Sequence, residues 1–160
     1  MAVVYFKRYR MQIDLREIRF EDFQIPVGYE FHPWNFRLLS AHAEAKYRSF
    51  RNELDANVFP CLGNADGCLR LMKEISCRQG FVPESTWLVT HDNPETGRRE
   101  NCGTVQGISE KIEVGSIQNI GIVQSQRGKG IGSLIVKHSL QGFQQAGIKF
   151  VTLEVTAHNT

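Results

Sequence analysis

The first half of the chain shows one alternating and two helical patterns of apolar residues. Apolar residues alternate with polar ones from Tyr5 to Leu15, which predicts a strand. Residues 21–35 carry two prolines and a glycine and are predicted to form a connection. Apolar residues spaced by three and four then predict a helix over residues 35–54. Its charged residues fall largely off the apolar stripe; they are Arg37, Glu44, Lys46, Arg48 and Arg51.

A second helix and a strand-rich half follow. The helical spacing resumes at Cys68, with Asn64 or Asp66 as a candidate N-cap and Gly80 as a stop. Residues 85–91 and 101–110 are typical of a hairpin, and 113–123 of a third strand. A helix over 131–147 and a strand over 148–155 complete one domain, residues 1–160. The final strand–helix–strand unit is expected to be parallel and right-handed.

Composition and charge narrow the class of protein. The 160 residues are 41% hydrophobic and 22% charged, which is typical of a globular domain. The net charge of +2 is too small to argue for nucleic acid, and the basic clusters fit solvated positions. Apolar runs fall far short of the ~20 residues that span a bilayer. With no signal-peptide pattern at the N-terminus, we expect a cytoplasmic protein without a membrane partner. The four cysteines form no CxxC pair, so we expect no metal site and thiols that serve as small hydrophobes.

The sequence QSQRGKGIGS, residues 124–133, stands where a strand passes into a helix. Such a place presents unpaired backbone N–H groups, and glycines let a phosphate approach them. The triphosphate-loop motif fails, because Val123 stands where its first glycine is required and Gly130 follows Lys129. The dinucleotide motif also fails at its third glycine, where Ser133 stands. Glu154 is suitably spaced to hold a ribose, but too few residues follow it for a second half-sheet.

A third pattern, [QR]-x-x-G-x-[GA], is met by Arg127, Gly130 and Gly132. With the flanking strand and helix, it resembles the acetyl-CoA binding loop of the GNAT superfamily of N-acetyltransferases. The resemblance implies a mixed α/β fold: a twisted, mostly antiparallel sheet, flanking helices and a splayed parallel strand pair, 114–123 and 148–156. It also implies acetyl-CoA as cofactor, with an N–H near Val123 polarising the thioester. The implied cofactor-binding residues are Ile122, Val123, Arg127, Gly128, Lys129, Gly130, Ile131, Gly132, Ser133 and Asn159.

The resemblance leaves the proton acceptor open. Many members use a glutamate on the strand before the loop, but the corresponding position here is Ser116. Gln118 lies on the same strand face and could orient a water molecule. Glu113 is expected on the opposite face, and Glu154 on the adjacent strand is the best remaining carboxylate. His138 is expected to be packed or solvated rather than catalytic.

Members of this family usually continue past the last strand into a helix and a closing hairpin. We therefore expect a C-terminally incomplete domain whose final strand has an unpaired edge, covered by a homodimer or by strand exchange. The implied function is acetyl transfer to an amine on a small molecule or peptide, by direct attack in a ternary complex. The alternative is a non-catalytic acyl-CoA-binding or sensing module. Arg51, Glu53 and Asp55 favour a polar or cationic acceptor.

Overall fold

The computed structural model describes residues 8–53, 56–57 and 59–156. Its main elements lie along the chain in the predicted order, apart from an extra early strand. They are β1 (Arg8–Asp14), β2 (Tyr29–Pro33), α1 (Leu39–Phe50), α3 (Ala65–Cys77), β3 (Trp87–Asp92), β4 (Arg99–Lys111), β5 (Val114–Ile122), α4 (Ile131–Gln145) and β6 (Phe150–Thr156). Short 3-10 helices are η1 (Phe36–Leu38), η2 (Pro60–Gly63), η3 (Pro83–Ser85) and η4 (Gln124–Gln126).

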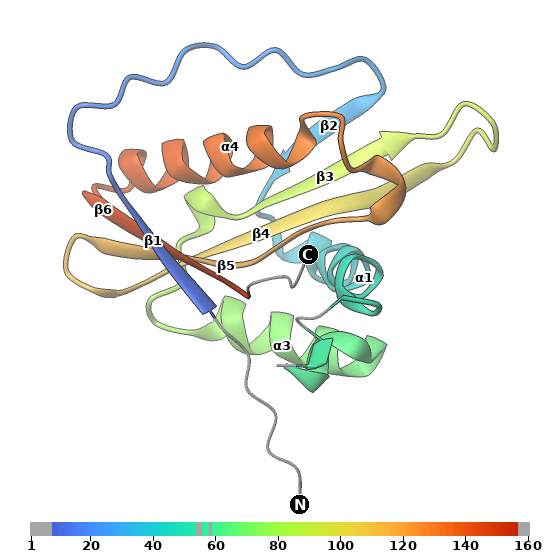
Figure 1. Ribbon diagram of the computed structural model, residues 1–160, viewed down its shortest axis with the longest axis horizontal. Coiled ribbons are helices and arrows are strands. Elements are labelled where there is room, and N and C mark those ends of the chain that lie inside the picture. Colours follow the sequence, from blue (N-terminus) through green and yellow to red (C-terminus); the bar gives the residue numbers. More distant parts are fainter. Residues whose placement is uncertain (1–7, 54–55, 58, 157–160) are drawn as a thin grey trace, which may run out of the picture.

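The strands form one six-stranded sheet in the order β1-β6-β5-β4-β3-β2. All neighbours are antiparallel except β5 and β6, which are parallel and are joined through α4. Helix α4 and the connection from β1 to β2, residues 15–28, lie over one face of the sheet, and α1 and α3 lie over the other (Figure 1). The predicted fold class, a mostly antiparallel sheet with one parallel pair and flanking helices, is confirmed.

The final strand does not have the unpaired edge that we expected. β6 lies inside the sheet, with β5 on one side and β1 on the other. The β1–β6 pairing runs from Arg8↔Thr156 to Asp14↔Phe150, so the N-terminal strand covers the whole length of β6. The prediction was wrong because hydrophobic alternation locates a strand but does not identify its neighbour. No second chain is needed to cover this edge.

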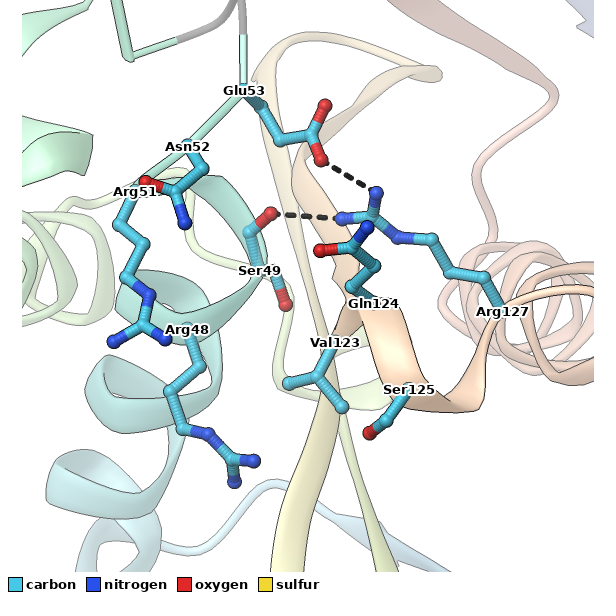
Figure 2. A pocket seen from close by; sticks show the side chains of 9 residues that line it. All are labelled: Arg48, Ser49, Arg51, Asn52, Glu53, Val123, Gln124, Ser125 and Arg127. Atoms are coloured by element: carbon cyan, nitrogen blue, oxygen red, sulfur yellow. Dashed lines mark hydrogen bonds and ion pairs between the residues drawn. The ribbon is translucent and has the colours of Figure 1, made fainter.

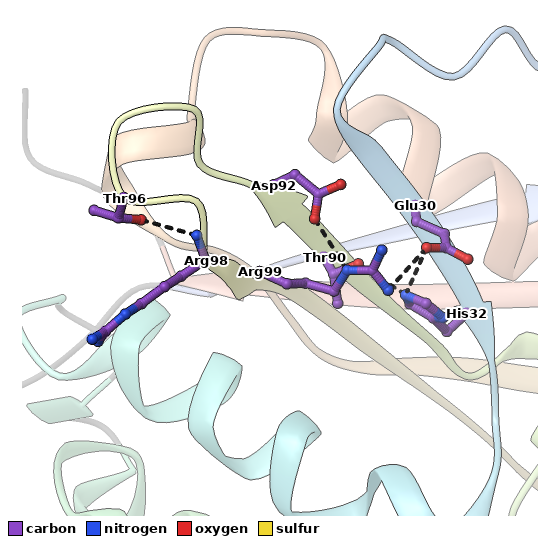
Figure 3. Close-up of polar contacts among 7 residues, drawn as sticks. All are labelled: Glu30, His32, Thr90, Asp92, Thr96, Arg98 and Arg99. Atoms are coloured by element: carbon purple, nitrogen blue, oxygen red, sulfur yellow. Dashed lines mark hydrogen bonds and ion pairs between the residues drawn. The ribbon is translucent and has the colours of Figure 1, made fainter.

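The connection predicted for residues 21–35 contains a strand that the sequence analysis missed. β2 pairs with β3 from Tyr29↔His91 to Pro33↔Trp87 and forms an edge of the sheet. Arg99 on β4 reaches across β3, with Nη1 at 3.3 Å from a carboxylate oxygen of Glu30 and Nε at 3.1 Å from Asp92 (Figure 3). Five residues ending in proline are too short a stretch for an alternating pattern to be recognised. The strand is stabilised by its contacts with β3, and these are not visible in the local sequence.

Helix α1 is shorter than predicted and is buried around more of its circumference. The expected helix over 35–54 is a 3-10 turn followed by α1, which ends at Phe50. Lys46, predicted to lie off the apolar stripe, is fully buried, and its amine lies 3.7 Å from Met72 Sδ. The reason is that α1 is packed between the sheet and α3, so that a single stripe is too narrow to describe its buried surface.

The remaining local predictions agree with the structure, except that α3 ends at Cys77, with Arg78 already extended, rather than at Gly80. Asn64 caps α3 by accepting a hydrogen bond from the Gly67 N–H at 3.0 Å, as predicted. Helix α4 is followed by Gly147 in the left-handed region at φ +83°, as its role as a stop requires. The core lies on both faces of the sheet: Ile135 and Phe143 of α4 pack on one face, and Ala43 and Phe50 of α1 on the other.

Candidate functional site

The parallel pair β5–β6 opens partway along its length. Pairing runs from Val114↔Phe150 to Ile117↔Leu153 and then stops, although both strands continue. On its other side, β5 carries an extra residue against β4 between the pairs Gln106↔Gln118 and Thr104↔Gly121. Asn119 lies in this bulge with a left-handed φ of +52°. A bulge bends its strand and increases the local twist, which explains why β5 turns away from β6 here. The predicted splay is confirmed.

The main-chain groups at the opening differ by one residue from the predicted ones. The Val123 N–H donates to the Cys102 carbonyl at 2.8 Å, so it is committed to the β4 ladder. Successive N–H groups of a strand point to opposite edges, which directs the Ile122 N–H toward the opening. The Ile122 carbonyl also lies outside the ladder and accepts a hydrogen bond from Arg127 Nε at 2.9 Å. Ile122, rather than Val123, therefore has the donor that faces the gap.

The glycine loop forms an open cradle at the start of α4. Gly128 and Gly130 have φ of +75° and +81°, and no atom lies within 4 Å of the position that a Cβ would occupy on either. Gly130 is the N-cap and provides no side chain to cap the helix. The first hydrogen bond of the helix runs from the Leu134 N–H to the Gly130 carbonyl at 3.2 Å. The N–H groups before Leu134 therefore have no partners within the helix. This geometry suits an anion at the positive end of the helix dipole.

Arg127, which the resemblance implies to be a cofactor-binding residue, is directed away from the loop. Its Nη1 forms an ion pair with Glu53 at 2.5 Å, and its Nη2 donates to the Ser49 carbonyl at 2.9 Å (Figure 2). The guanidinium thus ties the end of α1 to the end of β5. Lys129, whose Nζ lies 3.4 Å from Gln126 Oε1, is the cation that remains on the loop.

A groove of about 1000 Å³ follows α4 on its face of the sheet. Gly132, Ser133 and Lys137 of α4 form one wall, the connection over residues 18–24 forms the other, and Ile120 of β5 lies between them. The connection is fastened to the helix, because Gln144 Nε2 donates to the carbonyls of Leu15 and Ile18 at 2.8 and 2.7 Å. The groove therefore runs beside the cradle and reaches the residue at which β5 diverges.

A smaller hollow of about 270 Å³ lies on the opposite face of the sheet, at the closed end of the strand opening. Ser116 and Gln118 of β5 and Thr152 of β6 line it, and Gln118 Nε2 donates to Ser116 Oγ at 2.8 Å. The register places Glu154 on this same face, one pair beyond the last pair, and its side chain is exposed. Glu113 is instead in the β4–β5 turn with φ +65°, where its carboxylate lies 2.8 Å from Lys149 Nζ.

The remaining predicted residues are structural or lie outside the described residues. His138 is buried against the rings of Phe31 and Phe23, at centroid distances of 4.4 and 4.6 Å, and burial lowers its pKa. Cys102 is fully buried, and burial raises the pKa of its thiol to about 12, which argues against a nucleophilic role. Asn159 and Asp55 lie outside the described residues.

The structure was also searched for metal sites and for membrane-spanning helices. No group of three or more histidine, cysteine or acidic side chains is placed to hold a metal ion within the described ranges. Across the same residues, no helix is long and apolar enough to cross a membrane.

The sequence did not reveal the three cationic residues around the rim of the smaller hollow. Arg10 comes from β1, Arg78 follows α3, and Lys111 ends β4. Nothing in the local sequence distinguishes these cations from ordinary surface charges. Arg10 joins the other two because β1 pairs with β6, which no motif indicated.

Comparisons with known proteins agree with this arrangement. The family model described as "Acetyltransferase (GNAT) family" matches residues 14–160. A search of curated proteins found no match. Similar solved structures include a GCN5-related N-acetyltransferase from Sphaerobacter thermophilus, with TM-score 0.70, 19% identity and coverage of 96% of this chain and 45% of that one. A GNAT family acetyltransferase from Brucella melitensis, in complex with acetyl-CoA, has TM-score 0.57, 12% identity and coverage of 78% and 74%. The ribosomal-protein-S18-alanine N-acetyltransferase of Escherichia coli has TM-score 0.54, 12% identity and coverage of 82% and 70%. At these identities the structures share a fold, and the chain spans less than half of the Sphaerobacter protein.

Proposed function

The chain belongs to the acetyltransferase (GNAT) family, and from this we propose that it transfers an acetyl group from acetyl-CoA to an amine. We further propose that the described elements act as one acetyltransferase domain. The observation that carries the proposal is the opening between β5 and β6, since the α4-side groove reaches Ile120 on one face and the hollow reaches Gln118 on the other. A donor on one face and an acceptor on the other can meet there in a ternary complex.

The residues beside α4 fit coenzyme A. The cradle of Gly128 to Ser133 suits the pyrophosphate, because its glycines leave open space and its N–H groups precede the helix. Lys129 and Lys137 supply positive charge beside it, and the groove accommodates the pantetheine arm. At the opening, the Ile122 N–H can pair with the arm or hydrogen-bond the thioester carbonyl oxygen.

The transfer itself requires a neutral amine. The amine nitrogen attacks the thioester carbon, the carbonyl oxygen becomes negative, and the C–S bond then breaks to release the thiolate of coenzyme A. A backbone donor directed at that oxygen stabilises the negative charge as it forms. We propose Glu154 as acceptor of the amine's proton through water, with Gln118 orienting the water, since an amide cannot itself take a proton. Both lie on the acceptor side of the sheet.

Binding tests the cofactor site independently of turnover. Gly130→Ala places a side chain at φ +81° in the cradle, and Gly97→Ala makes the same change at φ +68° in the β3–β4 turn. Each should cost about 1 kcal/mol of stability, because both positions favour glycine. We expect only Gly130→Ala to weaken acetyl-CoA binding, by about tenfold or more, in isothermal titration calorimetry. Equal affinities of the two variants would contradict the assignment of the cradle.

Turnover distinguishes the enzyme from the alternative, a non-catalytic acyl-CoA-binding module. Purified protein is incubated with acetyl-CoA and a panel of amines, and products are detected by mass spectrometry alongside thiol release. We expect amine-dependent thiol release with an acetylated product. Tight binding without product from any amine would support the module, and Ser116 in place of an acid is the observation that favours it. Absence of binding would contradict both.

A further inference from the structure

The hollow on the acceptor side of the sheet has an unusual set of charges. Its floor is formed by Ser116, Gln118 and Thr152, which have uncharged polar side chains. Three cationic residues stand around it: Arg10 of β1, Arg78 just after α3 and Lys111 at the end of β4. Glu110 is the single acidic residue among the described residues that line it. The hollow therefore has an excess of positive charge.

Carboxylates balance part of this charge, and Glu154 lies directly opposite Arg10 in the β1–β6 register. Arg78 is shared with Glu110, at a distance of 3.7 Å between Nη1 and Oε1. Within the described part of the chain, neither Arg10 nor Lys111 takes part in an ion pair. Cations gathered around a concave surface raise the local concentration of anions and provide hydrogen-bond donors for them.

The position of the hollow connects it with the acetyl-transfer site. Thr152 pairs with Ser116 in the last stretch of β5–β6 pairing, and Gln118 lies one residue beyond the last pair. A molecule in the hollow is thus adjacent to the opening through which the thioester would be presented. At about 270 Å³, the hollow is near the lower end of the range for small-molecule sites, so it suits a molecule of amino-acid size.

We propose that the acceptor is a small amine that also carries a carboxylate, and that Arg10 and Lys111 bind the carboxylate. This proposal rests on the proposed acetyltransferase function and specifies its substrate class. It replaces the cationic acceptor suggested by Glu53, because the carboxylate of Glu53 is held by Arg127.

The same cations bear on the deprotonation of the amine. A positive charge near an ammonium group disfavours its charged form and so lowers its pKa. An acceptor held with its amine toward the opening would lose its proton more readily than it does in water. This effect reduces the demand on a protein base, at a site where β5 presents Ser116 rather than a carboxylic acid. The carboxylate of the acceptor offsets the repulsion between the ammonium and the cations during binding.

Matched acceptors test the substrate class. The twenty common amino acids and their primary amides are compared as acceptors at equal concentration, with kcat and KM measured by thiol release. The amine of an amide is the less basic of the two, so basicity alone would favour the amides. We expect the acids to have at least tenfold higher kcat/KM. Amides that serve as well as the acids would overturn the proposal while leaving the acetyltransferase function intact.

Variants test the two cations. Arg10→Gln and Lys111→Gln should each raise KM for the acids about tenfold and leave KM for the amides within about twofold. Arg98→Gln in the β3–β4 turn is a matched control, because Arg98 does not line the hollow. Circular dichroism establishes that each variant is folded, and equal effects on acids and amides would overturn the proposal.

Calorimetric binding of the same acids and amides to the protein saturated with coenzyme A provides a readout without turnover. Acids that bind through Arg10 and Lys111 without being acetylated would support the binding site and contradict the acetyltransferase function. If neither acids nor amides bind or react, the proposal is overturned.

Discussion

The buried amine of Lys46 is expected to reduce the stability of the fold, and its removal should therefore increase stability. Lys46 lies between the sheet and α3, is fully buried and has its amine 3.7 Å from the sulfur of Met72. A thioether is a weak hydrogen-bond acceptor. Burial lowers the pKa of this lysine from 10.5 to about 7. Its replacement by methionine keeps a long unbranched side chain and removes the charge.

The magnitude follows from the difference between the folded and unfolded pKa. Because the folded value is the lower one, the unfolded chain binds the proton more tightly, and protonation destabilises the fold. The penalty is absent above pH 10.5, grows as the pH falls, and is complete below pH 7. A difference of about 3.5 pH units corresponds to about 5 kcal/mol at 1.36 kcal/mol per unit. Between pH 7 and 8.5, the wild-type protein should gain about 2 kcal/mol from this group alone.

Urea unfolding of wild type and Lys46→Met at several pH values between 7 and 8.5 measures this penalty. We expect the variant to be more stable by about 4 kcal/mol at pH 7, and its advantage to shrink as the pH rises. The measurements stop at pH 8.5 because of Cys68, whose pKa burial raises from 9.0 to about 11. Above pH 8.5 this thiol would ionise in the unfolded chain but not in the folded one, which would add a second pH dependence. Lys73→Met, on the exposed side of α3, is the control and should change the stability little. A Lys46→Met variant no more stable than wild type, or with an advantage independent of pH, would refute the reasoning.

Two further predictions concern a second buried base and an ion pair. Burial lowers the pKa of His42 from 6.5 to about 3, so wild type should lose stability as the pH falls below 6.5, by about 1.4 kcal/mol per unit from this residue. His42→Gln should show a shallower loss in urea unfolding between pH 6.5 and 5, and an unchanged slope would contradict the burial argument. Glu53→Gln and Arg127→Gln should show a coupling of about 1 kcal/mol in a double-mutant cycle, because their ion pair is only partly exposed. Coupling that is zero at low salt would indicate that the contact does not tie α1 to the glycine loop.

Much of the fold could be predicted because its signals are local. Helices α3 and α4 have apolar stripes, a capping asparagine and a terminating glycine, each of which acts within a few residues. Strands β3 to β5 follow one another as a meander with short turns, so their pairing follows from their order. The glycine loop could be located for the same reason, since its strand, turn and helix are contiguous in the sequence.

The sequence by itself thus determined the order of the elements and the place of the donor-binding loop. Only the tertiary structure decided that β1 covers β6, that Arg127 points to α1, that Lys46 is enclosed by α3, and that Arg10, Arg78 and Lys111 surround one hollow. These outcomes depend on contacts between residues far apart in the chain. The free energy of such contacts comes from burial and charge pairing across elements, which neither periodicity nor spacing contains. The donor loop can therefore be recognised in a ten-residue stretch, whereas the proposed acceptor site combines residues of four strands with Arg78, which follows α3.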